Sequence, residues 1–393
     1  MKSRLHAICA FALAARCACA LAATNAIAVS DAELAAEAFM DAGLESAMSG
    51  DYAAALKSFT TAAQRDPLLA EAQFNIGACH ERFGLFDEGR PFYEKAVALA
   101  PSNARFRFVY GTALGRNGDI TGAVEQLCAA RQLEPRNAEY LYNAGVAFAM
   151  ATQFVDAVSC FESAAEIITN NSAIWFNLGL ARLCLGQTNS GAAAFSAVDT
   201  NSPVAAQAQY HLAVIAAQQG SVTEAIRHAT LSSTLDPLIE ETRWLLAGLR
   251  QQNGEYQAAA VIFDGFATTH PGEDERLARF YADWAAQAEH TGAWAAARIR
   301  YEKAQLYQPR DPRIHMAIAR CASALGDTAG AHEALDRAAR YADGSEAGME
   351  IARLRATLAR RAPPLQKHET APPPAVPPPP HGAGGTEAVV GAP

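Results

Sequence analysis

Prolines recur at a fixed interval along most of this chain. Six of them share one register with a spacing of 34 residues, and Thr169 stands at the one missing step: Pro67, Pro101, Pro135, Pro203, Pro237 and Pro271. Pro309 follows after 38 residues, which places a four-residue insertion near Asp274 to Leu277. A period of this length indicates a repeat array in which each unit buries its apolar face only against its neighbours.

Other positions keep the same period when Ala36 is counted as position 1. Position 15 is glycine in every unit except the fourth, which has Thr152. Glycine there predicts the end of a first helix, because it adopts a left-handed backbone freely. Positions 8 and 20 are small and position 24 is mostly large, which predicts two closely packed helices with a bulky side chain filling the gap. Proline at position 32 predicts the end of the second helix, because it has no N–H to donate.

These residues resemble the tetratricopeptide repeat family, whose motif has small residues at 8, 20 and 27, aromatic or Leu residues at 4, 7, 11 and 24, and Pro at 32. The best copy is Trp175, Leu178, Gly179, Gly191, Phe195 and Pro203. The resemblance covers Ala36 to about Ser345 and implies an all-α fold, a right-handed α-α superhelical solenoid of helix-turn-helix units. The nine expected units span 36–69, 70–103, 104–137, 138–171, 172–205, 206–239, 240–273, 278–311 and 312–345.

The two ends of the chain differ from the array. Lys2 and Arg4, an apolar stretch and small residues before two candidate cleavage points, after Ala22 or Ala28, predict a signal peptide over 1–28. Export to the periplasm or the medium follows, with an uncleaved membrane anchor as the alternative. Apolar residues at helical spacing predict a capping helix over 346–361. Ten of the 19 prolines lie in the tail, 362–393, which predicts disorder or polyproline II, as a ligand or a passive tail.

Charge and cysteine content exclude several classes of function. The net charge is -9, and removal of the basic N-terminal segment makes it -12. Without a basic cluster, the chain is unsuited to nucleic acid or to an anionic membrane surface, and no membrane insertion is expected after signal cleavage. The five cysteines beyond the signal form no CxxC pair, which favours small buried residues over a metal site. No nucleophile elbow, phosphate-binding loop or HExxH motif occurs. No catalytic residue, cofactor or metal is therefore expected, and the chain is expected not to be an enzyme.

One row of side chains carries functional information. Position 5 is aromatic in six consecutive units, from Phe74 to Trp244, and position 6 adds three Asn and one His. In the family, position 5 of the first helix faces the concave groove, so the resemblance implies a row of partly exposed aromatic groups beside amides that can pair with a peptide backbone. The predicted partner-binding residues are Phe74, Asn75, Phe108, Tyr142, Asn143, Phe176, Asn177, Tyr210, His211 and Trp244. Clamp-type recognition of a terminal carboxylate is not expected, because that mode uses Lys and Asn at positions 5 and 9.

The leading hypothesis is a protein-binding scaffold of the bacterial envelope that takes a protein or an extended peptide in its concave groove. A structural subunit of an envelope secretion or polysaccharide-export assembly is the first alternative, and an accessory module of a separate enzyme is the second. The sequence leaves the partner and the oligomeric state open.

Overall fold

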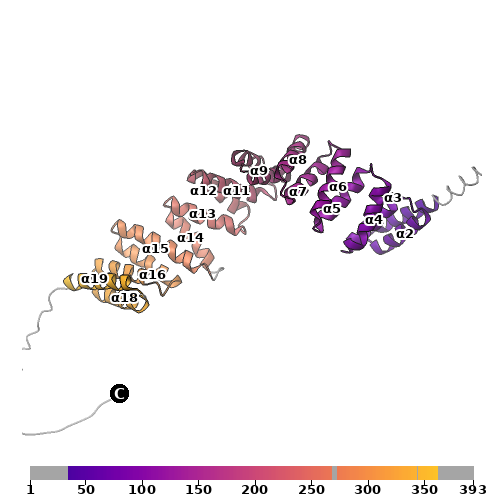
Figure 1. Cartoon of the computed structure of the whole chain (residues 1–393). Coiled ribbons are helices and arrows are strands. Elements are labelled where there is room, and N and C mark those ends of the chain that lie inside the picture. Colours follow the sequence, from indigo (N-terminus) through magenta and orange to yellow (C-terminus); the bar gives the residue numbers. More distant parts are fainter. Residues whose placement is uncertain (1–33, 268–271, 343, 362–393) are drawn as a thin grey trace, which may run out of the picture. The chain divides into compact units, whose positions relative to one another are not determined.

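The structure, a computed structural model, describes residues 34–267, 272–342 and 344–361, and within these ranges it contains helices and no strand (Figure 1). The predicted signal peptide and the proline-rich tail lie outside the described residues. Consecutive helices pack as hairpins, and each hairpin packs on the next. The prediction of an all-α solenoid of tetratricopeptide-like hairpins is confirmed.

A first helix over residues 34–48 opens the described part of the chain. The elements that follow it are α2 (Tyr52–Arg65), α3 (Ala70–Arg82), α4 (Phe86–Leu99), α5 (Ala104–Arg116), α6 (Ile120–Leu133), α7 (Ala138–Met150), α8 (Phe154–Ile167), α9 (Ser172–Cys184), α10 (Thr188–Ser196), α11 (Ala205–Gln218), α12 (Val222–Leu235), α13 (Glu240–Gln252), α14 (Tyr256–Ala267), α15 (Asp274–His290), α16 (Trp294–Tyr307), α17 (Pro312–Ala324), α18 (Thr328–Tyr341) and α19 (Ser345–Arg361). The chain divides after Ile262 into two compact units. We call them the N-terminal unit and the C-terminal unit and describe each by itself.

The turn inside each hairpin has the left-handed residue that the sequence predicts. Eight glycines at position 15 have φ between 72° and 89°, and Thr152, at the same position of the fourth hairpin, has φ 59°. The next amide closes the turn on the carbonyl five residues back, as Asp119 N does on Leu114 O at 3.0 Å. Gln153 N does the same with Phe148 O at 2.8 Å, so Thr152 adopts the glycine geometry despite its Cβ.

Close packing explains the small residue at position 8. A Cβ on Gly179 would lie 2.6 Å from the ring of Phe195, and one on Gly145 would lie 2.7 Å from the ring of Phe161. Both rings are fully buried. In the sixth hairpin the position-24 residue is Ala229, and position 8 there holds Ala213. Position 8 therefore needs glycine only where position 24 carries a ring.

Second helices end near the proline but do not depend on it. Helix α6 ends at Leu133, two residues before Pro135, and α8 ends at the equivalent Ile167 although Thr169 replaces the proline. The fifth hairpin departs from the expectation, because α10 already ends at Ser196, well before Pro203. Asp199 Oδ1 accepts the backbone N–H of Asn201 at 2.8 Å, and this local turn competes with a further turn of helix.

The four-residue insertion lengthens a helix in the C-terminal unit. Helix α15 has 17 residues, whereas α17 has 13, and the extra turn lies at its start, where the insertion is predicted. At the end of the unit, α19 packs against α17 and α18. It buries Ile351 and Leu358, and Arg355 pairs with Asp336 of α18.

Candidate functional site

The aromatic row at position 5 is not uniformly exposed. Phe74 is only 5% exposed, because its ring stacks on Phe106 at 4.5 Å and meets Tyr93 edge-on at 5.6 Å. The predicted partial exposure is therefore wrong for Phe74, which belongs to the core. The other aromatic members are half-buried: Phe108, Tyr142, Phe176, Tyr210 and Trp244. Their binding role stays a prediction.

The predicted amide row uses part of its hydrogen-bonding capacity within the protein. Asn143 Nδ2 donates to Glu139 O at 2.9 Å, one turn back on α7. Asn177 Nδ2 donates to Ala173 O at 2.9 Å and to the hydroxyl of Tyr142 at 3.1 Å. His211 stacks on Phe195 at 5.0 Å, and burial lowers the pKa of its imidazole. Asn75 is half-buried on α3. Among these amides, the Oδ1 atom of Asn143 remains without a protein donor in the described residues.

An apolar hollow of about 570 Å³ lies between α5, α6 and α7 in the N-terminal unit. It brings together two predicted binding residues, Phe108 and Asn143, with residues that the sequence reasoning missed. Its apolar wall is formed mainly by Phe108, Val109, Ile120, Leu127, Val146 and Met150. Met150 is 53% exposed at the edge. We call this cavity the apolar hollow.

Two glycines of α5 line the apolar hollow, and they are there for different reasons. A Cβ on Gly111, at position 8, would lie 2.8 Å from Leu127 Cγ, so the packing of α6 requires glycine. A Cβ on Gly115 would meet only Ala123 Cβ, at 3.5 Å, which is ordinary contact. Nothing in the packing requires glycine at 115. Its effect is to leave space.

The charged groups at the edge of the apolar hollow are not equivalent. Arg116 is paired, because its Nη1 lies 3.2 Å from Glu81 Oε1. Glu81 also accepts a hydrogen bond from the Tyr93 hydroxyl at 2.8 Å, and burial together with this carboxylate raises the pKa of Tyr93 strongly. Glu139 is exposed and forms no ion pair with any described residue. The uncompensated charge at this edge is therefore negative.

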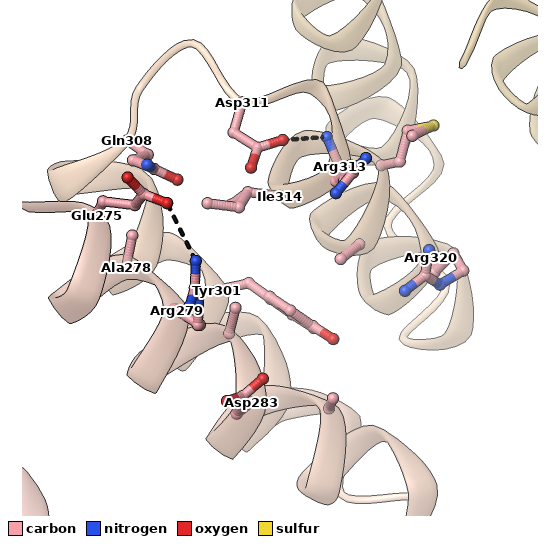
Figure 2. Close-up of a pocket in the computed structure, with 14 residues that line it drawn as sticks. Glu275, Ala278, Arg279, Asp283, Tyr301, Gln308, Asp311, Arg313, Ile314 and Arg320 are labelled. Atoms are coloured by element: carbon pink, nitrogen blue, oxygen red, sulfur yellow. Dashed lines mark hydrogen bonds and ion pairs between the residues drawn. The ribbon is translucent and has the colours of Figure 1, made fainter. Parts of the chain in front are cut away.

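A second cavity, of about 530 Å³, lies between α15, α16 and α17 in the C-terminal unit. Figure 2 shows Arg279 and Asp283 on α15 facing Arg313 and Arg320 on α17, with Tyr301 of α16 between them. Most of these charges are compensated locally. Arg279 lies 3.0 Å from Glu275, and Arg320 holds Glu289 through two hydrogen bonds of 2.8 and 3.1 Å.

The acid that binds Arg320 shows how strong this compensation is. Burial, the largest single influence, tends to raise the pKa of Glu289, but the hydrogen bonds from Arg320 and Tyr301 and the charge of Arg320 overcome it and hold the pKa below its ordinary value. Asp311 caps α17 by accepting the backbone N–H of Arg313 at 2.8 Å. This cavity therefore offers a balanced set of charges rather than a surplus of one sign.

The described residues contain no group of three or more His, Cys, Asp or Glu side chains placed to hold a metal ion. No helix within the described ranges is long and apolar enough to cross a membrane. The sequence could have indicated Gly115, because it is the one glycine at position 12 of the nine units. It could not have indicated that Val146 and Met150 of the next hairpin complete the wall.

Comparison with known proteins bears on the repeat itself. The sequence model of the tetratricopeptide repeat matches residues 40–104, 110–173 and 176–237. No curated protein matches the chain. Among solved structures, MamA is 20% identical over 42% of this chain and 89% of its own, with a TM-score of 0.40. YrrB, titled a protein with an unusual peptide-binding site, is 20% identical over 47% of this chain and 95% of its own, with a TM-score of 0.43. PilF of Pseudomonas aeruginosa is 18% identical over 56% of this chain and 99% of its own, with a TM-score of 0.46. With the registered glycines, the stacked hairpins and the match to the family model, the chain belongs to the tetratricopeptide repeat family.

Proposed function

We propose that this chain is a non-enzymatic scaffold that binds an extended segment of a partner protein on the first helices of its N-terminal unit. The observation that carries the proposal is the apolar hollow between α5 and α7, together with the half-buried aromatic residues at position 5 of neighbouring hairpins. Concave apolar surface with a few polar groups is the usual form of a binding site, and aromatic side chains supply much of the energy at interfaces.

We further propose that the scaffold works outside the cytoplasm. The predicted signal peptide, 1–28, supports this location, and a reporter that is active only after export, fused behind residue 33, tests it. An active reporter and a mature N-terminus at Ala23 or Val29 would support export. Retention of the uncut chain in the cytoplasm would contradict it.

The binding proposal is tested with the purified chain and a displayed library of short random peptides. Replacement of Phe108, Tyr142 and Phe176 together by Ala should weaken the selected peptides by about tenfold or more, because each truncation removes apolar contact. The control replaces two exposed side chains of second helices, Val155 and Val261, each 68% exposed. Helix content is followed by circular dichroism in both variants. Equal loss of binding in both would favour the alternative of an assembly subunit that docks through its outer surface.

A further inference from the structure

We infer that the apolar hollow selects one large aliphatic or aromatic side chain of an extended peptide, and that Glu139 selects a Lys or Arg beside it. This inference rests on the proposed function and deepens it, because it states the chemistry of the partner segment. It does not depend on the aromatic row as a whole. It depends on three neighbouring features: the space at Gly115, the unpaired carboxylate of Glu139 and the free oxygen of Asn143.

The space is the first feature. Glycine within a helix is unfavourable relative to alanine because it restricts the unfolded chain less. Gly111 has a packing reason for this and Gly115 has none, since an added Cβ would meet Ala123 at an ordinary 3.5 Å. A larger side chain at 115 would extend into the apolar hollow. The glycine therefore keeps open a cavity whose wall is apolar.

The wall determines what fits. A volume of about 570 Å³ lies in the range of small-ligand pockets and exceeds the room that one side chain needs, so a side chain and part of its backbone can enter. Val109, Val146 and Met150 offer no partner to a polar group. An acidic or amide side chain would lose its hydration there without compensation. A Leu, Ile, Met or Phe side chain would gain by leaving water.

The charge next to the hollow is the second selective feature. Arg116 is neutralised by Glu81 at 3.2 Å, whereas Glu139 has no cation within ion-pair distance in the described part of the chain. The described residues of the N-terminal unit, 34–262, contain 23 acidic and 14 basic side chains, a net charge of -9. The local and the overall field therefore both favour a basic neighbour and disfavour an acidic one.

The backbone of the peptide has a partner as well. Asn143 Nδ2 already donates to Glu139 O, so the amide is held in one orientation and Oδ1 is left as an acceptor at the wall of the hollow. An N–H of an extended peptide can donate to this oxygen. The arrangement places a backbone contact between the apolar position and the basic position of the ligand.

The test uses the purified full chain, the displayed random-peptide library and two substitutions at one residue. Gly115→Leu fills the hollow and Gly115→Ala adds a single methyl group that the structure accommodates. Both should raise the melting temperature, because both remove a helical glycine. Peptides selected on the natural chain should contain an aliphatic or aromatic residue next to Lys or Arg. Gly115→Leu should weaken them by about tenfold or more, and Gly115→Ala by less than about twofold.

The charge is tested with Glu139→Gln, which should weaken a selected peptide about two- to fivefold at low salt, the range of an exposed ion pair, and remove most of the salt dependence. Selected peptides that bind Gly115→Leu as tightly as the natural chain, or that are enriched in acidic residues, overturn the inference. If such peptides still lose binding in the triple alanine variant, the proposed function stands without it. Absence of any selected peptide overturns both.

Discussion

Thr152 offers a direct measurement of the backbone strain in this repeat. Eight hairpins have glycine at position 15 with a left-handed φ, and the fourth hairpin has Thr152 with φ 59°. The substitution Thr152→Gly leaves the turn hydrogen bonds unchanged, since Thr152 N already donates to Ala149 O at 3.0 Å and Gln153 N to Phe148 O. The threonine side chain is exposed and makes no hydrogen bond among the described residues. The substitution therefore isolates the conformational term.

The magnitude follows from two opposing effects. A left-handed backbone costs an L-residue about 1–2 kcal/mol, which glycine avoids. Glycine gives the unfolded chain more freedom, which offsets about 0.4–1 kcal/mol of this gain. We expect Thr152→Gly to stabilise the fourth hairpin by about 0.5–1 kcal/mol. The reverse substitution, Gly186→Thr in the fifth hairpin, where φ is 72°, should destabilise by a similar amount.

Native-state hydrogen exchange is the suitable assay, because a repeat array opens hairpin by hairpin and a global melting curve averages over all of them. The slowest amides of α7 and α8 should exchange about two- to fivefold more slowly in Thr152→Gly. Those of α9 should exchange faster in Gly186→Thr. Unchanged exchange in both variants would show that the turn does not limit opening of the hairpin. Faster exchange in Thr152→Gly would refute the strain argument.

Three further outcomes follow from the packing and the titrating groups. Gly179→Ala should destabilise by about 1–3 kcal/mol, because its Cβ would lie 2.6 Å from the Phe195 ring, whereas Gly248→Ala, with no atom within 4 Å, should stabilise by up to about 1 kcal/mol; urea denaturation compares the two, and equal effects would contradict the packing argument. The folded pKa of Glu289 is depressed, so its pairing with Arg320 stabilises above the ordinary value of 4.5 and this contribution is lost as the pH falls through the folded pKa. Glu289→Gln should therefore be less stable than the natural chain at pH 7, and its stability should fall less between pH 5 and about pH 3; parallel pH profiles would contradict the assignment. Among the described cysteines, Cys184 is exposed and Cys79, Cys160 and Cys321 are buried, with burial as the main cause that raises the pKa of Cys321 to about 11. Iodoacetamide should modify Cys184 first, which mass spectrometry can show, and early labelling of Cys321 would indicate local opening.

The repeat could be predicted from the sequence because its causes are local to one position. A left-handed turn selects glycine, and a ring at position 24 selects a small residue at position 8, so both leave a mark every 34 residues. The length of α10 could not be predicted in this way. Pro203 lies in register, but the turn at Asp199 ends the helix earlier, at Ser196. A periodic signal marks where a helix must have stopped and leaves open where it stops.

The candidate site was harder to predict because exposure depends on neighbouring hairpins. Phe74 and Phe108 occupy the same position of consecutive units, yet Phe74 is buried under Phe106 while Phe108 lines the apolar hollow. Phe106 is at position 3 of its unit, where no period-34 pattern draws attention to it. Residue type at position 5 predicts an apolar first helix, and the adjoining unit decides whether that side chain belongs to the core or to a surface.

The three classes of glycine in this chain show where function can be separated from folding. Gly118 is needed by the backbone, which has φ 89°, and Gly111 is needed by the Leu127 side chain, which an added Cβ would approach to 2.8 Å. Either requirement alone explains why glycine stands there. Gly115 meets neither requirement, although it lies three residues from one and four from the other on the same helix and turn. Since glycine at that point weakens α5 without any gain in packing, its physical consequence is the open wall of the apolar hollow, and ligand selection is the property that a larger residue at 115 would remove while the fold became more stable.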